Sequence, residues 1–471
     1  METTEKIWFN GKILNVSYEL NDNGFRIKIF GTNRYGVDYY PAKIFSELDL
    51  KAKKALLENF IYAWTRPLAL LMDYGLFFES NKPLIKNFVD YGILGDLSRI
   101  ADLNKVKTQK LLADFKKFDK NGEIIFRGKK SERMLPPKKT SSEKAILALS
   151  FGKDSLLSYG IAKEIGLDCQ VVFVRDIKGY NKEYIEAEAK HKSRIIKSFI
   201  ENERIPINFL IDNVDEIFSD RKIKSKIKDL ENTNGMLTFV LEFIPVAYYH
   251  QAKYLILGNE ANFVDSFKNQ DGFKTYPSFD QTVIYTKREN QYLKRLTNGN
   301  IQVISLIEPI YNLAEMKILY HRYPYLLQYL MSCSPEKKGS EKWCYQCPMC
   351  AKAFLYSVAV GGDPQKIGFK QNFFAKRYKQ LYPLFTKKIT RPHEKPKAVS
   401  EEQLLSFLLA YRQGWRGDLI NLFKEKYLAV ATRREKELRK KFFGIHSSLT
   451  IPKEIKNKVI DIYQEELVSL I

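Results

Sequence analysis

A short polar stretch that follows an apolar run is the part of this sequence best suited to chemistry. Residues 145–149 are continuously apolar, which is typical of a strand buried on both faces. A helical pattern runs from Leu156 to Gly166. The six residues between the two patterns are the candidate loop: Ser150, Phe151, Gly152, Lys153, Asp154 and Ser155. A turn at a helix start presents free N–H groups and the positive end of the helix dipole, so it predicts a phosphate site. The alternative is an ordinary strand-to-helix turn.

Two common phosphate loops do not fit this stretch. One needs a glycine, four residues, and then Gly-Lys-Ser/Thr, and the dinucleotide fingerprint needs three glycines. Gly152 is the only glycine of the candidate loop. A different kind of nucleotide loop is therefore expected.

Four of the five cysteines lie close together, at Cys333, Cys344, Cys347 and Cys350. Clustered thiols in a chain without a secretion signal indicate a metal. Four thiolates leave no open position on a tetrahedral ion, so the pattern predicts a structural Zn²⁺. An iron–sulfur cluster is the rival, because Cys-x-x-Cys-x-x-Cys also suits a cluster. Cys169 stands alone and is expected in the core.

Strand and helix patterns alternate on either side of the candidate loop. Helices are expected over 183–202 and 235–251, and strands over five ranges: 145–149, 170–175, 207–212, 254–258 and 302–307. This alternation predicts an α/β fold with a doubly wound parallel sheet. Ligands of such sheets bind beyond the carboxyl ends of the strands.

A second polar stretch follows the fourth expected strand. Gly258, Asn259 and Glu260 come directly after it, and Asp280 and Gln281 lie further along the same long loop. Long loops at this edge of a sheet are usually functional, so these residues are candidates to bind nucleotide, substrate or metal. The alternative is a surface excursion built from ordinary turn residues.

Four regions are expected from the changes in pattern: an α+β region over 1–138, the α/β region over 141–330, the cysteine segment over 331–360 and a helical region over 361–471. In the first, 5–10 and 25–30 alternate like strands, with a turn at 22–24, and 52–74 forms a helix interrupted near Pro67. In the last, Ser400 is the expected N-cap of a helix, and the charge run 433–441 is expected to be a solvated helix face, with nucleic-acid contact as the alternative.

The composition limits the possible partners. The net charge of +22 suits a nucleic acid or an anionic nucleotide, but the lysines are spread along the chain and interleaved with glutamates, as in a lysine-rich organism. Nucleic acid is therefore a possible partner but not a required one. No run of 18 uncharged apolar residues indicates a membrane span, and the first residues lack a signal-peptide pattern, so a cytoplasmic protein is expected.

The candidate loop resembles that of the PP-loop ATP pyrophosphatases, usually Ser-Gly-Gly-x-Asp-Ser, and differs at Phe151, where glycine is usual. In the 7-cyano-7-deazaguanine synthases, which are about half as long, such a loop is paired with a late cysteine site, and 308–317 is similar to the stretch before their cysteines. The UDP-N-acetylmuramoyl-L-alanyl-L-glutamate epimerase family is closer in layout over roughly 141–415. Its cysteine segment resembles 343–355. Its tail motif resembles 394–402, except that Lys397-Ala-Val-Ser400 replaces its Cys-Val-Gly, and the loop at 276–281 also departs from the pattern.

The resemblance implies an adenine nucleotide alpha-hydrolase-like fold and cleavage of ATP between its α and β phosphates. A substrate carboxylate, possibly nucleotide-linked, would become an adenylate. Ser150, Gly152, Lys153 and Ser155 would then hold pyrophosphate, and Asp154 would hold Mg²⁺. The adenylate could lead to epimerisation, with His250, Glu260 or Asp280 as base, or to an amide or nitrile. A nucleotide-binding module without catalysis is the third possibility.

Overall fold

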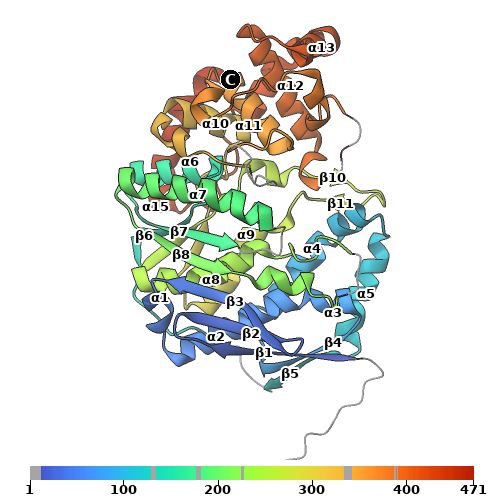
Figure 1. The fold of residues 1–471 in the computed structure, drawn as a ribbon, viewed down its shortest axis with the longest axis vertical. Coiled ribbons are helices and arrows are strands. Elements are labelled where there is room, and N and C mark those ends of the chain that lie inside the picture. The colour runs from blue at the N-terminus through green and yellow to red at the C-terminus, as the bar shows by residue number, and fades with distance from the viewer. Residues whose placement is uncertain are drawn as a thin grey trace, which may run out of the picture.

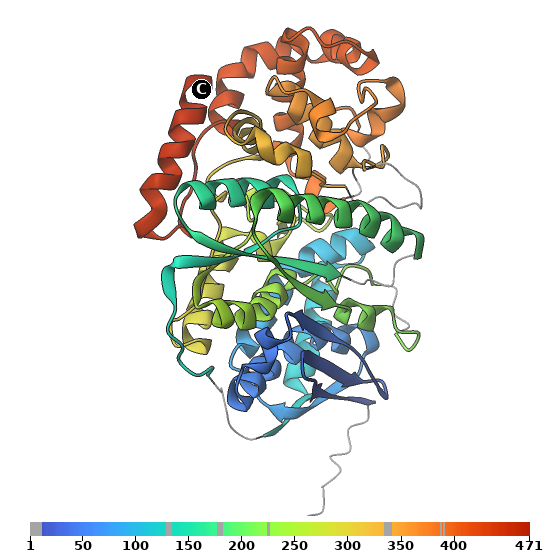
Figure 2. The same ribbon diagram turned by 60° about the vertical axis from the view of Figure 1, so that its left-hand side comes forward.

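The computed structural model describes residues 12–128, 134–176, 182–223, 227–333, 342–386, 389 and 391–471. These residues form an α/β fold around one mostly parallel sheet of ten strands (Figure 1), in the order β12-β9-β6-β7-β8-β3-β2-β1-β4-β5. Helices cover both faces of this sheet, and a layer of helices from the last part of the chain lies beyond one face (Figure 2).

Five parallel strands form the half of the sheet that carries the candidate loop. They are β6 (Ser141–Ala148), β7 (Asp168–Asp176), β8 (Ile207–Asp212), β9 (Ala252–Ile256) and β12 (Gln302–Ile304). All five were predicted from the apolar runs. The chain starts at β6, runs outward to β7 and β8, and then returns to place β9 and β12 on the other side of β6. The direction in which successive strands are added to the sheet therefore reverses between β6 and β9, although the two strands are parallel. The loops that follow these two neighbouring strands lead to opposite faces of the sheet.

Alternate residues of these strands enter two separate cores. Ala145 and Leu147 of β6 pack on one face with α6 (Lys153–Glu164), α7 (Lys182–Glu203) and α10 (Asn312–His321). Ile146 faces the other side, against α8 (Gly235–His250) and α9 (Val283–Leu296). Both faces are buried, which explains why the strand has no polar alternation. Cys169 is buried in β7, as expected.

The N-terminal region continues the same sheet. β3 (Thr32–Tyr40) pairs antiparallel with β8, and the sheet continues through β2 (Gly24–Ile29), β1 (Ile13–Leu20), β4 (Gly75–Asn81) and β5 (Ile124–Gly128). The strand expected over 25–30 is confirmed as β2, and β1 is its hairpin partner. The range 5–10 lies outside the described residues.

Helices of the N-terminal region cover one face of the shared sheet. They are α1 (Lys43–Ser46), α2 (Leu50–Thr65), α3 (Pro67–Met72), α4 (Lys86–Asn104) and α5 (Thr108–Lys120). The predicted interruption near Pro67 is confirmed, since α3 begins at that residue. α2 and α4 belong to the same core as α8.

The C-terminal layer consists of α11 (Pro348–Ala359), α12 (Lys397–Arg412), α13 (Asp418–Lys426), α14 (Leu428–Phe442) and α15 (Lys453–Leu467). The expected N-cap at Ser400 is wrong. Pro396 is the N-cap residue, α12 begins at Lys397, and the hydroxyl of Ser400 donates to the Lys397 carbonyl at 2.9 Å. The run 433–441 lies in α14, where four of its nine residues are exposed and Leu438 is buried, so the expected solvated face is present only in part.

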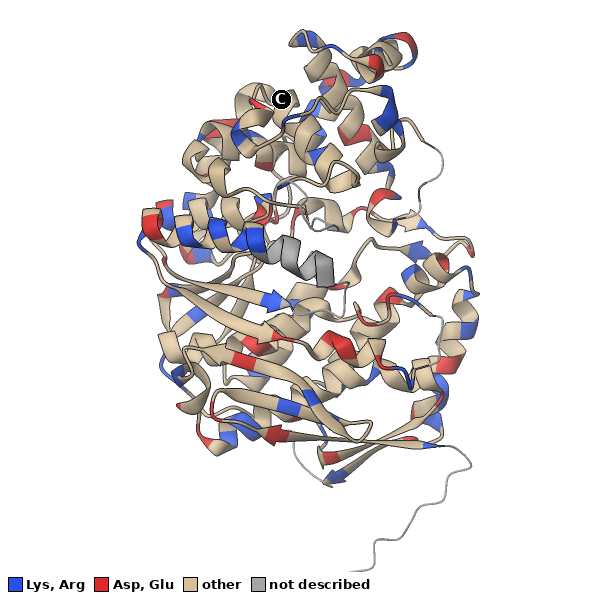
Figure 3. Cartoon of the chain, in the orientation of Figure 1, with Lys and Arg blue, Asp and Glu red and all other residues tan. Residues whose placement is uncertain are grey.

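Basic and acidic residues both occur in every layer of the fold (Figure 3). Among the described residues, no helix is both long and apolar enough to cross a membrane.

Two buried glutamates fasten the C-terminal layer to the sheet domain. Glu402 of α12 accepts hydrogen bonds from the backbone N–H of Leu313 at 2.8 Å and from the hydroxyl of Tyr356 at 3.0 Å. Glu308, which follows β12, accepts hydrogen bonds from Ser447, Leu449 and Thr450. Glu402 therefore holds the start of α10, and Glu308 holds the segment before α15.

The buried carboxyl of Glu402 predicts a pH dependence of stability. Burial is the main cause that raises its pKa to about 7 from the ordinary 4.5. Between these values the unfolded chain has released this proton while the folded chain still holds it. The free energy of unfolding should therefore fall as the pH rises through this window, by up to roughly 3 kcal/mol, and then level off. Urea unfolding at a series of pH values measures this change.

Glu402→Gln should lack this contribution, so the stability difference between variant and parent should change between pH 4.5 and 7. Glu454→Gln, at an exposed position of α15, is the control. Parallel pH profiles for the parent and both variants would contradict the prediction.

Candidate functional site

A cavity of about 450 Å³ lies where the order of strands in the sheet reverses, between β6 and β9. Its polar wall includes Ser150, Gly152, Asp154, Ser155, Gly258, Asn259, Glu260 and Gln281. Its apolar wall includes Val172, Phe173, Val174, Met236, Phe239 and Phe243. The two polar stretches that the sequence placed after separate strands therefore meet in one cavity, as expected for neighbouring carboxyl ends.

The loop after β6 places a helix start beside this cavity. Gly152 is the N-cap of α6, and its N–H donates to the hydroxyl of Ser150 at 3.3 Å. The hydroxyl of Ser155 lies 3.3 Å from that of Ser150 and donates to the Gly152 carbonyl at 3.1 Å. As at any helix start, the first N–H groups of α6 have no acceptor in the preceding turn. The loop can therefore receive an anion of phosphate size.

Phe151 belongs to the loop but its side chain points away from the cavity. Its ring is fully buried and packs against Phe173 and Phe199, with ring centroids 6.0 and 5.5 Å away. Its backbone is left-handed, with φ of +63°, a conformation that favours glycine. Its carbonyl accepts a hydrogen bond from the N–H of Met331 at 2.8 Å. Packing in the core thus holds a bulky residue in a glycine conformation.

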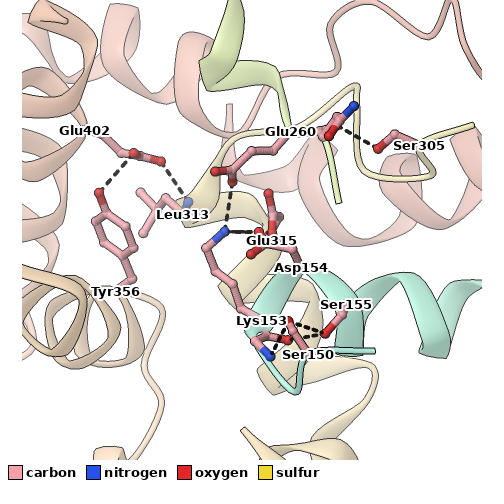
Figure 4. A network of polar contacts seen from close by, with 12 residues as sticks. Ser150, Lys153, Asp154, Ser155, Glu260, Ser305, Leu313, Glu315, Tyr356 and Glu402 are labelled. Atoms are coloured by element: carbon pink, nitrogen blue, oxygen red, sulfur yellow. Dashed lines mark hydrogen bonds and ion pairs between the residues drawn. The ribbon is translucent and has the colours of Figure 1, made fainter. Parts of the chain in front are cut away.

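Lys153 lies in the centre of a cluster of three carboxylates (Figure 4). Its ammonium contacts Asp154 and lies 2.8 Å from Glu260 and 3.0 Å from Glu315. Each acid comes from a different element, since Asp154 lies on α6, Glu260 follows β9 and Glu315 lies on α10. The lysine therefore joins three parts of the chain at the edge of the cavity.

The charges in this carboxylate cluster shift one another's pKa values. Burial disfavours the ammonium of Lys153, but the adjacent Asp154 and the two glutamates outweigh it and raise its pKa well above the usual range. Burial likewise raises the pKa of Glu315 well above its ordinary value, since Lys153 offsets only part of the desolvation. The cluster consists of hard oxygen ligands that suit Mg²⁺.

The backbone after β9 is held close to the loop after β6. A Cβ atom at Gly258 would lie 3.0 Å from the Cβ of Asp154, so the approach leaves little room for a side chain. Asn259 is buried, its amide donates to Thr286 at 3.2 Å, and its carbonyl accepts from Ser305 at 2.7 Å. These contacts direct Glu260 toward Lys153.

The three remaining substrate candidates lie in different places. His250 is the last residue of α8, directly before β9, so it lies at the opposite edge of the sheet, where it contacts Asn208 at 3.1 Å. Asp280 is buried and accepts hydrogen bonds from Ser278 and from the N–H of Met236 at the start of α8. Gln281 alone of the three lines the cavity.

Two charged residues of the site were not singled out from the sequence. Glu315 lies in the stretch 308–317, which was noted only for a family resemblance, and the packing of α10 brings it to Lys153. Lys192 of α7 is buried, and its ammonium contacts the carbonyls of Ser150 and of Met331, the latter at 3.2 Å. No local motif marks Lys192.

The four clustered cysteines converge on one point. Their Sγ atoms are 3.9 Å apart for Cys333 and Cys347, 3.7 Å for Cys344 and Cys350, and 3.5 Å for Cys347 and Cys350. Four sulfurs at 2.3 Å from a tetrahedral ion would be about 3.8 Å apart. The set could therefore hold a metal ion such as zinc.

The cysteine cluster also contributes to the wall of the cavity. Met331, Ser332 and Met349, which flank the cysteines, line the cavity. Met331 additionally binds the loop through Phe151 and Lys192. The segment that bears Cys333 is thus connected directly to the phosphate-binding candidate.

Comparison with known proteins finds no matching protein-family model and no match among curated proteins.

The environment of Phe151 predicts the effect of its replacement. Phe151→Gly should relieve the left-handed strain, worth roughly 1 kcal/mol, but lose the buried ring, which typically contributes about 3 to 5 kcal/mol. The free energy of unfolding of the variant, measured in urea, should therefore be about 2 to 4 kcal/mol lower than that of the parent.

Phe151→Ala is the matched comparison, because it loses the same ring and keeps a Cβ at φ of +63°. It should be less stable than Phe151→Gly by about 1 kcal/mol. Equal stability of the two variants would show that the left-handed backbone is not a constraint here.

Proposed function

We propose that this chain is an ATP-dependent enzyme that transfers AMP to a substrate carboxylate and releases pyrophosphate. The proposal rests on one observation: the Ser150–Ser155 loop and Gly258–Glu260 meet in one cavity. This cavity lies where the order of strands in the sheet reverses, between β6 and β9. A helix start, a lysine and three carboxylates lie together there, and this combination suits a nucleotide with its cation.

The cavity has a wall for each half of ATP. The phosphates would lie on the loop, where Ser150, Ser155 and the first N–H groups of α6 donate hydrogen bonds. The adenosine would lie along the apolar wall that includes Val172, Val174 and Phe239. The cavity of about 450 Å³ is in the usual range for a ligand of this size.

The reaction would be a displacement at the α-phosphorus. An oxygen of the substrate carboxylate forms a bond to the α-phosphorus, the bond from that phosphorus to the α–β bridging oxygen breaks, and pyrophosphate leaves with the bond's electron pair. Lys153 and the loop N–H groups would stabilise the charge that develops on the leaving group. Mg²⁺ bound at Asp154 would supply further charge neutralisation.

The substrate proposed in finer detail is a nucleotide-linked peptide with a terminal glutamate, epimerised after activation. It is supported by the resemblance of 343–355 and 394–402 to the epimerase family. Of the three candidate bases, Glu260 lines the cavity, whereas His250 lies at the opposite edge of the sheet. The second candidate is an amide- or nitrile-forming ligase, favoured by the similarity of 308–317 to the deazaguanine synthases.

We also propose that the cysteine cluster holds a structural zinc ion. Four Sγ atoms fill a tetrahedral shell, and backbone N–H groups of Cys344 and Cys350 point to Sγ atoms of the set at 3.4 Å. The ion would hold the segment that carries Met331 and Ser332 against the loop.

Turnover of ATP tests the proposed reaction. With ATP labelled in the α-phosphate and UDP-N-acetylmuramoyl-L-alanyl-L-glutamate or a carboxylated deazaguanine, we expect labelled AMP and free pyrophosphate. Asp154→Ala should lower the rate by at least about 100-fold, because it removes the carboxylate that would hold the Mg²⁺ that neutralises charge on the leaving pyrophosphate.

Asp168→Ala is the control, since Asp168 begins β7 at the far edge of the sheet. Release of ADP, or full activity of Asp154→Ala, would contradict the assignment. Product analysis separates the two candidates, because epimerisation in heavy water incorporates deuterium and amide formation lowers the substrate mass by about one unit.

Metal analysis tests the zinc site. The purified protein should contain one zinc per chain, and Cys347→Ser should lose it together with several kcal/mol of stability, since metal binding contributes to folding. Cys169→Ser, a buried cysteine outside the cluster, should keep the metal. Iron with acid-labile sulfide and a brown colour would overturn the zinc assignment.

A further inference from the structure

We propose that Asp154, Glu260 and Glu315 bind one divalent cation in the absence of nucleotide, and that the ammonium of Lys153 is an internal counter-ion that this cation displaces. The inference rests on the proposed function for the role of the cation in turnover. The binding itself needs no nucleotide and is tested without one.

The carboxylate cluster has the dimensions of a cation site. One oxygen from each of the three acids lies within 4.8 Å of the other two. Oxygens on opposite sides of an octahedral cation are about 4.2 Å apart for Mg²⁺ and about 4.8 Å apart for Ca²⁺, given bond lengths near 2.1 and 2.4 Å. The acids therefore need little movement to enclose a metal ion.

Glu315 provides a second, independent sign of a missing partner. Its side chain is fully buried, and one oxygen lies 3.0 Å from Lys153. The other oxygen, Oε1, accepts no hydrogen bond from any residue that the structure describes. A buried acceptor without a partner costs about 1 to 3 kcal/mol, and a cation between the acids would satisfy it.

The charges of the cluster also leave room for a second positive charge. Three acids surround one ammonium, so one negative charge of the cluster remains uncompensated even when Glu315 holds a proton. A divalent cation neutralises this remainder or replaces the ammonium outright. Lys153 has a flexible four-carbon stem, so its charge can leave the acids while its backbone stays in the loop.

Displacement of Lys153 gives the lysine a role in substrate binding. Lys153 is the first residue of α6 and follows directly after the candidate phosphate-binding turn. An ammonium released from the three acids can reach an anion in the adjoining cavity. The cation should therefore bind first and raise the affinity of the protein for nucleotide. By linkage, bound nucleotide should raise the affinity for the cation by the same factor.

Manganese titration of the nucleotide-free protein tests the proposal. The protein is first saturated with zinc, and the free Mn²⁺ signal is then followed by electron paramagnetic resonance. We expect one bound Mn²⁺ per chain. Glu315→Gln should weaken its binding about tenfold or more, because it removes an anionic oxygen ligand. Lys153→Met should tighten binding severalfold, because it removes the competing internal cation.

Glu289→Gln is the matched control, since Glu289 is another fully buried glutamate but lies on α9 outside the cluster. It should leave Mn²⁺ binding unchanged. Circular dichroism confirms that each variant folds. Absence of Mn²⁺ binding, unchanged binding in Glu315→Gln, or weaker binding in Lys153→Met would overturn the proposal. If AMP and pyrophosphate still form in any of those cases, the proposed reaction stands and only the nucleotide-free cation site fails.

Discussion

The ion cluster around Lys153 is the interaction on which the arrangement of the site depends. It joins an acid from α6, one from the loop after β9 and one from α10, and Lys153 and Glu315 are 162 residues apart in sequence. The parallel pairing of β6 with β9 brings the first two together, and the close approach of Gly258 to Asp154 lets their loops touch. The third acid requires α10 to lie against α6, which the C-terminal layer secures. Glu402 binds the N–H of Leu313 at the start of α10, two residues before Glu315.

The C-terminal layer of helices therefore supports the site. Tyr356, on the helix that follows the cysteines, donates to the same Glu402 that holds α10. Met331, just before the cysteine cluster, donates its N–H to the carbonyl of Phe151 in the candidate loop, and its carbonyl accepts from the ammonium of Lys192. A metal ion bound by the four cysteines would thus fix both the helix that bears Tyr356 and the segment that bears Met331. Loss of that ion should loosen the loop and α10 together, through contacts that cross the face of the sheet.

Local patterns predicted the parts of the structure that depend on local physics. The five parallel strands, the helix start after Ser150, the break at Pro67 and the cysteine set all follow from apolar runs, proline and ligand spacing. Residues brought in by tertiary packing were missed: Lys192 lies in no local motif, and the resemblance of 308–317 did not mark Glu315 as a site residue. The N-cap expected at Ser400 is wrong because Pro396, four residues earlier, is the N-cap of α12. The position of His250 could have been predicted, since a helix that precedes a parallel strand ends at the amino edge of the sheet, away from the ligand.

The two unusual residues of the candidate loop have different physical explanations. Phe151 holds a left-handed backbone that glycine would adopt without strain, but its buried ring more than offsets that cost, so stability alone explains it. Lys153 is desolvated among acids. Buried ion clusters contribute little net stability compared with apolar packing, because the loss of hydration offsets most of their attraction. The position of Lys153 is explained if the loop receives charges from outside, since a cation and a polyphosphate would exchange the lysine's internal partners for ligand partners. The desolvated charge at this helix start, and not the strain at Phe151, is therefore the argument for binding.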